Sequence, residues 1–512
     1  GREDTIDGEP WKLELNEDQQ RVIQAVHQGG NVFMTGSAGT GKSFVLRHVI
    51  KELQKMHGGS RGVQVTASTG AAAVLIGGTT LHAFAGIGLG HGDPQTLVAK
   101  IFRNFPAMAR WKACKALIVD EISMVDAELF TKLEFVARKI KNPTKPFGGI
   151  QVVLAGDFFQ LPPVSSALNK FAFDSPAWYT AKMGMIELRQ VIRQGETDFV
   201  QILNELRWGK VTAASAAALM ACTAKIQKGP TNSMVLATKL HPHNINVRSD
   251  NEKSLRLLSG EVHTFEADDD AAGGKGQAHR LDSLGVAKSL SLKIGAQVMC
   301  LKNIAVEDGL VNGARGVIQD FVRASSVLNA TAFGAERPDP NVLYPKVKFA
   351  CGITQVMTRY PFSVMDHDKA IATRKQLPLA LAWAVSVHKC QGMTIDRVEA
   401  SLGQAFDHGM VYVALSRVKS LAGLILRGFD PTKVSAHPSV SAFYRKNGCA
   451  PPFETPTAPA PEMAGDKNDM EEVTLADIQA DDSGAEMDDG GDEEKGVGAQ
   501  TAVGVHGAAE VR

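Results

Sequence analysis

Residues 36–43 read Gly-Ser-Ala-Gly-Thr-Gly-Lys-Ser and match the pattern G-x-x-x-x-G-K-[ST] of a phosphate-binding loop. Glycines let backbone N–H groups curl around phosphate oxygens, Lys42 neutralises the outer phosphates, and Ser43 offers its hydroxyl to Mg²⁺ at the start of a helix. An apolar run at 32–34 precedes this phosphate loop, and a stretch of helical period at 44–56 follows it. The sequence therefore predicts an ATP site formed by Gly36, Ser37, Ala38, Gly39, Thr40, Gly41, Lys42 and Ser43.

A pair of acidic residues follows a second apolar run. Residues 117–119 read Leu-Ile-Val and lead directly into Asp120 and Glu121. A strand there would deliver both carboxylates to its carboxyl end. We expect Asp120 to bind Mg²⁺ and Glu121 to orient and deprotonate the attacking water.

A third chemical segment, residues 156–164, reads Gly-Asp-Phe-Phe-Gln-Leu-Pro-Pro-Val and also follows a strand-like run. We expect Gln160 to reach the terminal phosphate or its water, and Asp157 to hold the local turn. Phe158 has two interpretations that the residues leave open. It is either a ring on which nucleic-acid bases stack or an ordinary core side chain.

Runs of strand length alternate with helical patterns along the chain. A first group of strands is expected at 32–35, 63–67, 117–119 and 150–155, and a second at 233–238, 381–387, 398–402 and 424–426. Such alternation indicates parallel sheets with helices on both faces. The expected fold class is α/β, with two such domains.

Residues 295–376 differ from both groups, because they are rich in Val and in Gly and Asn turns. Asn312-Gly313 and the alternating residues 346–349 indicate hairpins, so we expect a small β-barrel insert. Residues 268–276 are expected to form a solvent-exposed loop, and 451–512 a disordered tail that is Pro-rich and then acidic.

Charge is unevenly distributed. The 512 residues contain 55 Lys and Arg and 55 Asp and Glu. From Glu454 to Arg512 there are sixteen acidic and three basic residues, a net charge of −13, which leaves +13 on the preceding residues. A basic body fits a polyanionic partner, although such a surplus also serves solubility.

Other classes of protein are disfavoured. The chain has no apolar stretch long enough to span a membrane. Its six cysteines are scattered, without a C-x-x-C pair or clustered histidines, which excludes the familiar zinc spacings and indicates a reducing compartment. Because the chain begins at Gly1, we expect it to be a piece of a longer protein, and an upstream targeting segment is not excluded.

In their order along the chain, these segments resemble the motifs of superfamily 1 helicases, and specifically those of the Pif (petite integration frequency) family of 5′ to 3′ DNA helicases in group B. Residues 126–147 resemble the signature insert of that family. The resemblance covers residues 13–446, with Cys390 where serine is usual. The matching segments are the phosphate loop and residues 15–19, 66–70, 80–84, 120–124, 156–163, 188–194, 386–394 and 412–417.

The resemblance gives further residues roles. Gln19 would read the adenine edge with its two-sided amide, and Arg193 and Arg417 would reach the transition-state phosphate from the second domain. Lys389 and Gln391 fit either DNA or the nucleotide cleft. The implied contacts to single-stranded DNA are Ser68, Thr69, Thr80, His82, Phe84, Phe158, Ser386 and His388.

The resemblance also implies a domain layout. Two RecA-like P-loop domains with parallel sheets would occupy residues 13–185 and 186–446. The first would carry a small wedge insert at about 81–115, and the second an SH3-like β-barrel insert at about 295–376. Residues 1–12 would form an N-terminal arm, and 447–512 a disordered acidic tail.

The implied function is that of an ATP- and Mg²⁺-dependent helicase that moves 5′ to 3′ on single-stranded DNA and unwinds duplex, forked or G-quadruplex DNA. The family further implies telomere maintenance, recombination, repair and replication, in the nucleus or mitochondrion of a eukaryote. We expect a monomer, with dimerisation on DNA left open, and an acidic tail that binds a protein or competes with DNA. The alternatives are a RecD-like helicase, an ATP-driven DNA clamp or nucleoprotein remodeller, and a small-molecule kinase.

Overall fold

The structure is a computed structural model that describes residues 5–6, 9–10, 15–88, 90–163, 171–191, 197–223, 236–242, 244–270, 281, 284–302, 304–305, 308, 310, 312–323, 339–366, 369–393, 395, 397–403 and 405–453. Within the expected N-terminal arm it describes a short antiparallel pair, β1 (Thr5–Ile6) and β2 (Glu9–Pro10). Arg193 and the acidic residues from Glu454 onward lie outside the described residues.

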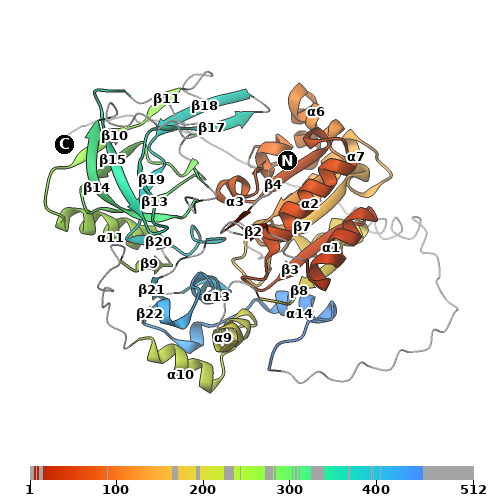
Figure 1. The fold of residues 1–512 in the computed structure, drawn as a ribbon. Helices are drawn as coiled ribbons and strands as arrows, with labels where there is room; N and C mark the ends of the chain where they lie inside the picture. Colours follow the sequence, from red (N-terminus) through yellow and green to blue (C-terminus); the bar gives the residue numbers. More distant parts are fainter. Residues whose placement is uncertain are drawn as a thin grey trace, which may run out of the picture. The chain divides into compact units, whose positions relative to one another are not determined.

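A parallel sheet forms the first α/β core (Figure 1). All four strands expected in the first group are present, each within one residue of its expected bounds. The buried strands β3 and β6 end directly at the phosphate loop and at Asp120. In spatial order the strands are β5 (Thr79–Thr80), β4 (Val63–Ala67), β6 (Ala116–Asp120), β7 (Gln151–Ala155), β3 (Val32–Gly36) and β8 (Gly184–Leu188).

The last strand of this sheet corrects the expected domain boundary. β8 pairs in parallel with β3 along its whole length, from Gly184 opposite Val32 to Leu188 opposite Gly36. A boundary between residues 185 and 186 would cut this strand. The first core therefore extends to Leu188.

Helices cover both faces of the first sheet. Successive strand residues point to opposite sides, so each strand contributes apolar side chains to the helices on both faces. Val32 and Met34 of β3 pack in one cluster with the apolar faces of α1 (Glu17–His27) and α2 (Lys42–Met56). Phe33, between them, belongs to the cluster on the other side with α7 (Ala127–Ile140). The remaining helices of this region are α3 (Gly70–Leu75), α4 (Leu81–Ala85), α5 (Pro94–Phe102), α6 (Phe105–Ala113) and α8 (Pro176–Thr180).

A second parallel sheet has the order β20 (Ala384–Ser386), β9 (Thr238–His241), β21 (Val398–Ser401) and β22 (Leu424–Arg427). β9 therefore lies later than the strand expected at 233–238. The strand expected at 381–387 is two strands, because residues 379–381 pair in an antiparallel sheet instead. The helices here are α9 (Thr197–Arg207), α10 (Ala213–Ala221), α11 (Asn244–Leu257) and α13 (Met410–Leu415). The last helix, α14 (Pro438–Lys446), instead packs on the first core, where the ring of Phe443 contacts those of Phe33 and Phe158.

Antiparallel sheets occupy the region of the expected β insert and extend beyond it on both sides. The alternation at residues 346–349 is confirmed, with Lys346 and Lys348 exposed and Val347 and Phe349 buried. One sheet joins β16 (Thr354–Val356), β15 (Leu343–Phe349), β14 (Arg315–Arg323), β13 (Gln297–Cys300) and β19 (Leu379–Leu381). The others join β11 (Asp268–Asp270), β18 (Lys369–Gln376) and β17 (Tyr360–Asp366), and β10 (His263–Glu266) with β12 (Ser289–Leu292).

Two expectations for loops are corrected here. Residues 268–270 are exposed as expected but form strand β11 rather than a loop, because Asp269 accepts two 2.8 Å hydrogen bonds from the buried guanidinium of Arg374 on the paired strand β18. Residues 271–276 of the expected loop lie outside the described residues. At the other end, residues 447–453 are not part of a free tail. Pro451 is buried, and Phe453 packs on the apolar core with Lys210 Nζ 4.8 Å from its ring centroid.

Within the described part of the chain, every helix is too short or too polar to cross a membrane.

Candidate active site

The phosphate loop adopts a conformation that depends on its glycines. Gly36, Gly39 and Gly41 all have positive φ angles, of 149°, 88° and 83°. A Cβ atom on Gly36 would lie 2.5 Å from the carbonyl oxygen of Leu188, so no other residue fits there. Lys42 begins α2, and its Nζ donates hydrogen bonds to the carbonyls of Gly36 (2.8 Å) and Ser37 (3.0 Å). The lysine charge is thereby held inside the curl of the loop.

A cavity of about 510 Å³ lies against this loop, within the size range of small-molecule sites. It is lined from the first core by the loop, Glu121 and Gln160, and from the region of the second core by Gly392 and Arg417. The structure thus brings together residues up to about 400 positions apart that were assigned to one site. The full lining is Asn16, Gln19, Ala38, Gly39, Gly41, Lys42, Ser43, Phe44, Glu121, Gln160, Gln190, Gly392 and Arg417.

Asp120 and Glu121 follow β6 in a strained turn. Glu121 has a φ of 52°, unusual for a residue with a side chain, and its N–H donates to Asp120 Oδ1 at 2.9 Å. Burial, and next the charge of Glu121, raise the pKa of Asp120 to about 7. A divalent cation would favour the ionised carboxylate, so this residue fits its expected role toward Mg²⁺.

Ser43 supplies a second oxygen from the lining of the cavity, whereas Asp120 itself directly precedes the lining residue Glu121. Mg²⁺ commonly uses one or two protein oxygens together with substrate phosphates and water. Among the described residues, no three His, Cys, Asp or Glu side chains are grouped to hold a metal by themselves. The donor set Ser43 and Asp120 therefore fits a magnesium ion that is bound together with a nucleotide.

Three glutamines present buried amide atoms that lack a hydrogen-bond partner within the described structure: Gln19 Nε2, Gln160 Oε1 and Gln391 Oε1. Gln19 and Gln160 line the cavity. Gln391 donates its Nε2 to Glu121 Oε2 at 2.9 Å, so it lies beside the carboxylate that lines the cavity. Because buried polar atoms are normally paired, these amides fit contacts to a ligand.

Gln19 cannot offer both its amide oxygen and its amide nitrogen to adenine without giving up a hydrogen bond within the protein. It forms a capping box at the start of α1, in which its Oε1 accepts the N–H of Asn16 (3.2 Å) and its own N–H donates to Asn16 Oδ1 (2.9 Å). One side of the amide is therefore engaged in the helix cap. The Nε2 group remains for the base.

Arg417 is buried just beyond the end of α13, at the edge of the cavity. Its Nε donates to the carbonyl of Val413 at 2.9 Å, and its Nη2 to Ser416 Oγ at 2.6 Å. Hydrogen bonds to α13 and to the residue that follows it thus fix the orientation of the guanidinium. Arg193, assigned a similar role, lies outside the described residues.

The residues expected to contact DNA follow strand ends in both cores. Ser68 and Thr69 follow β4, Thr80 precedes α4, and Ser386 ends β20. The hydroxyls of Ser68 and Ser386 are buried without a partner in the described structure, whereas Thr69 and Thr80 accept backbone N–H groups as helix caps. Accepting these bonds leaves the threonine O–H groups able to donate, so the serines differ from the threonines only in having no acceptor role among the described residues.

His82 and His388 are partly buried, and burial lowers the pKa of both imidazoles. At neutral pH both rings are therefore uncharged. They are suited to hydrogen bonding or stacking rather than to neutralising phosphate. Beside His388 lies Phe406, which is 57% exposed, with 6.4 Å between the ring centroids. No sequence motif indicated this aromatic pair.

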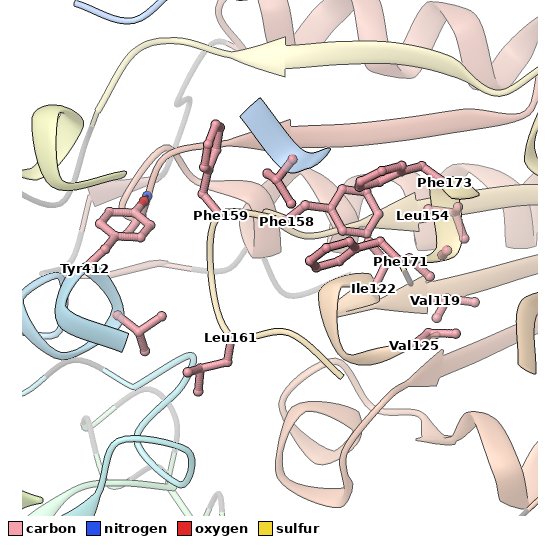
Figure 2. Packing of buried hydrophobic residues seen from close by; sticks show 14 of the residues in the cluster. Val119, Ile122, Val125, Leu154, Phe158, Phe159, Leu161, Phe171, Phe173 and Tyr412 are labelled. Carbon is pink, nitrogen blue, oxygen red and sulfur yellow. The ribbon is translucent and has the colours of Figure 1, made fainter. Parts of the chain in front are cut away.

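Phe84 and Phe158 are corrections, because both rings are buried in the first core. Phe84 is 2% exposed and packs on Trp111, 4.7 Å between centroids. Phe158 is 1% exposed and lies among the rings of Phe171, Phe173 and other aromatics (Figure 2). A ring whose faces are covered by protein offers no surface to a base. The core interpretation of Phe158 is therefore the right one.

Comparisons with known proteins agree with this geometry. Residues 14–217 match the family model of PIF1-like helicases, and residues 280–321 match the 2B domain of the DNA helicase Pif1. The chain is 42% identical over 468 residues to the human ATP-dependent DNA helicase PIF1, covering 90% of this chain and 68% of the relative. The chain spans 56–68% of the length of eight such curated relatives.

Solved structures show the same fold. The Pif1 helicase of Candida albicans superimposes with a TM-score of 0.73 at 38% identity, covering 85% of this chain and 99% of the other. The Pif1 helicase of Bacteroides, solved with ADP-AlF3 and single-stranded DNA, gives a TM-score of 0.59 at 26% identity, covering 85% and 98%. The chain belongs to the Pif1 family of ATP-dependent DNA helicases.

Proposed function

We propose that this chain hydrolyses ATP between its two α/β cores and uses the cycle to move 5′ to 3′ along single-stranded DNA and to unwind duplex DNA. One observation carries the proposal: a single cavity is lined by the phosphate loop, Glu121 and Gln160 on one side and by Arg417 on the other. A static nucleotide clamp has no need of an arginine from a second core. Such an arginine connects hydrolysis with relative motion of the cores.

The residues around the cavity divide the chemistry among them. Backbone N–H groups of the phosphate loop and Lys42 bind the phosphates, and the Nε2 group of Gln19 contacts the base. Glu121 accepts the proton of the attacking water, while Gln160 orients that water. Mg²⁺, when bound with ATP, supplies positive charge to the phosphate oxygens, with Ser43 and Asp120 as its protein ligands.

Arg417 completes this set by stabilising charge on the transferring phosphate. Its planar, permanently charged fork suits phosphate oxygens. Because Glu121 belongs to one core and Arg417 to the other, hydrolysis is fastest when the cores are correctly juxtaposed. This is the physical link between ATP turnover and strand movement.

Single-stranded DNA is the proposed track, along the strand ends that carry Ser68, Thr69, Thr80, His82, Ser386 and His388. The ssDNA-bound Bacteroides relative supports this partner. By family membership we further propose action on forked and G-quadruplex DNA, in telomere maintenance, recombination, repair and replication. The corresponding compartments are the nucleus and the mitochondrion, with the protein acting as a monomer or as a dimer on DNA.

A forked-duplex unwinding assay tests the proposal. Substrates with only a 5′ tail, only a 3′ tail or both tails are incubated with ATP and Mg²⁺, with Lys42→Ala as the inactive control. Unwinding that requires the 5′ tail supports the assignment. Unwinding that requires the 3′ tail overturns the polarity, and DNA-stimulated hydrolysis without strand separation supports a clamp or remodeller instead.

A further inference from the structure

A buried carboxylate that follows β7 accepts hydrogen bonds from side chains of three later helices. Asp157, three residues before Gln160, is 0% exposed. It accepts from the Tyr412 hydroxyl (3.2 Å), from the Tyr444 hydroxyl (3.2 Å) and from Arg207, whose Nε and Nη2 lie 3.0 and 3.1 Å away. From its place in the sequence, Asp157 was expected only to hold its local turn. The structure makes it the meeting point of α9, α13 and α14.

Arg207 neutralises this carboxylate. Its side chain is 5% exposed, and its third nitrogen, Nη1, donates to Glu187 on β8 at 3.0 Å. The guanidinium also lies over the rings of Phe159 (4.9 Å) and Tyr444 (5.1 Å). A buried ion pair with this many partners is rigid, because a charged group that moved would lose the hydrogen bonds and the opposite charge that offset its desolvation.

The two tyrosines connect this ion pair to different parts of the first core. Tyr412 accepts the backbone N–H of Ala38, inside the phosphate loop, at 2.7 Å. Tyr444 instead bonds the side chain of Thr35 (2.6 Å) and the N–H of Phe158 (3.2 Å), which belong to β3 and to the turn after β7. Tyr412, labelled in Figure 2, is therefore the member of the pair that holds the loop itself.

Tyr412 and Arg417 share one short segment of chain. Tyr412 lies in α13, and Arg417 follows that helix and donates back to the carbonyl of Val413. The hydroxyl of Tyr412 thus fixes the phosphate loop relative to the segment that carries Arg417. Burial raises the pKa of Tyr412, so its hydroxyl keeps the proton that it donates to Asp157.

We propose that Tyr412, held by the Asp157–Arg207 ion pair, is a positioning residue that sets the alignment of Arg417 with phosphates bound in the loop. The inference rests on the proposed hydrolysis at this cavity and on the proposed role of Arg417. Binding of ATP in the ground state depends mainly on the phosphate loop, whereas Arg417 acts in the transition state. Loss of the Tyr412 hydroxyl should therefore lower kcat more than it changes KM for ATP.

Tyr412→Phe and Tyr444→Phe form a matched pair for the test. Each removes one buried hydroxyl and one hydrogen bond to Asp157 while keeping the ring. We expect Tyr412→Phe to lower kcat of DNA-stimulated hydrolysis about tenfold, with KM for ATP changed less than about threefold, as for a lost transition-state contact. Tyr444→Phe should lower Tm to a similar extent but leave kcat within about twofold. Equal kcat in the two variants overturns the proposal.

A double-mutant cycle then shows whether Tyr412 acts through Arg417. In an Arg417→Lys background, Tyr412→Phe should have less than about a twofold further effect on kcat. A full tenfold further loss would mean that Tyr412 acts on the loop independently, and the proposal fails. If Arg417→Lys and Arg417→Ala both keep the parent kcat, it is the proposed role of Arg417 that is wrong. DNA affinity without nucleotide, measured for every variant, should not change.

Discussion

Gln391 Nε2 donates a 2.9 Å hydrogen bond to Glu121 Oε2, across 270 residues of sequence. Gln391 lies in a compact turn in which the N–H groups of Lys389 and Cys390 bond the carbonyl of Ser386 at 3.0 and 3.1 Å. The same turn carries His388. A contact between DNA and Ser386 or His388 is therefore connected to Glu121, the carboxylate proposed to activate water, through the backbone of this turn and the Gln391–Glu121 hydrogen bond.

The first prediction tests this connection. Gln391→Ala removes the only side chain of the turn that the described structure shows bonded to Glu121. We expect the ratio of hydrolysis rates with and without single-stranded DNA to fall about tenfold, the effect of about 1.4 kcal/mol of lost coupling. Steady-state ATPase assays with and without an oligonucleotide measure it. An unchanged ratio would show that stimulation reaches the site by another route.

A second prediction separates binding from catalysis in the nucleotide site. Lys42→Ala removes the charge placed on the outer phosphates, and Glu121→Gln keeps the size of the side chain but removes the base. Both variants should lose DNA-stimulated hydrolysis. Only Glu121→Gln should still bind ATP with Mg²⁺, measured by equilibrium binding of a fluorescent nucleotide. Hydrolysis by Glu121→Gln at the parent rate would contradict the assignment of the base.

The partly buried histidines give a pH dependence of stability. Burial lowers the folded-state pKa of His82 and His388 below the unfolded value of about 6.5. Below that pH the unfolded chain binds more protons, so their contribution is full above about pH 6.5 and is lost as pH falls through the lowered values. We expect Tm to fall on acidification below about 6.5, and to fall less in the variant His82→Gln/His388→Gln. Identical profiles for variant and parent would refute this.

A fourth prediction concerns Phe158, whose ring is buried among other aromatic rings. Phe158→Ala should destabilise the protein by about 3–5 kcal/mol, the usual cost of truncating a buried aromatic ring. Denaturant unfolding measures this loss. The control is Phe105→Ala, since Phe105 is 81% exposed and should contribute little. A Phe158→Ala variant that kept its stability but lost DNA affinity would instead support stacking of the Phe158 ring on nucleic-acid bases.

The fifth prediction concerns the acidic residues from Glu454 to Arg512. A segment with a net charge of −13 that is covalently joined to a body of +13 can compete with DNA for the same cationic surface. If it does, deletion of residues 454–512 tightens binding of a short oligonucleotide at low salt, and the difference fades as salt screens the charges. A salt series with and without these residues measures it. Superimposable curves would leave solubility or partner binding as their role.

The sequence by itself determined the features that depend on neighbouring residues. The phosphate loop, the Asp120-Glu121 pair and four of the six strands of the first sheet follow from local spacing and period, and the structure places them as expected. The capping box of Asn16 and Gln19, which was not predicted, is equally local. These features require only a few consecutive residues, because the groups that act together are joined by a short segment of chain.

Tertiary structure decided the rest. Whether the ring of Phe158 faces a base or the core depends on aromatic residues as distant as Phe443. The position of Gln391 beside the cavity likewise depends on its hydrogen bond with Glu121. The Asp157–Arg207 ion pair with Tyr412 joins three segments whose separate patterns carry no sign of one another. Burial and long-range hydrogen bonds arise only when the cores pack, so no local pattern in the sequence can encode which of these residues will meet.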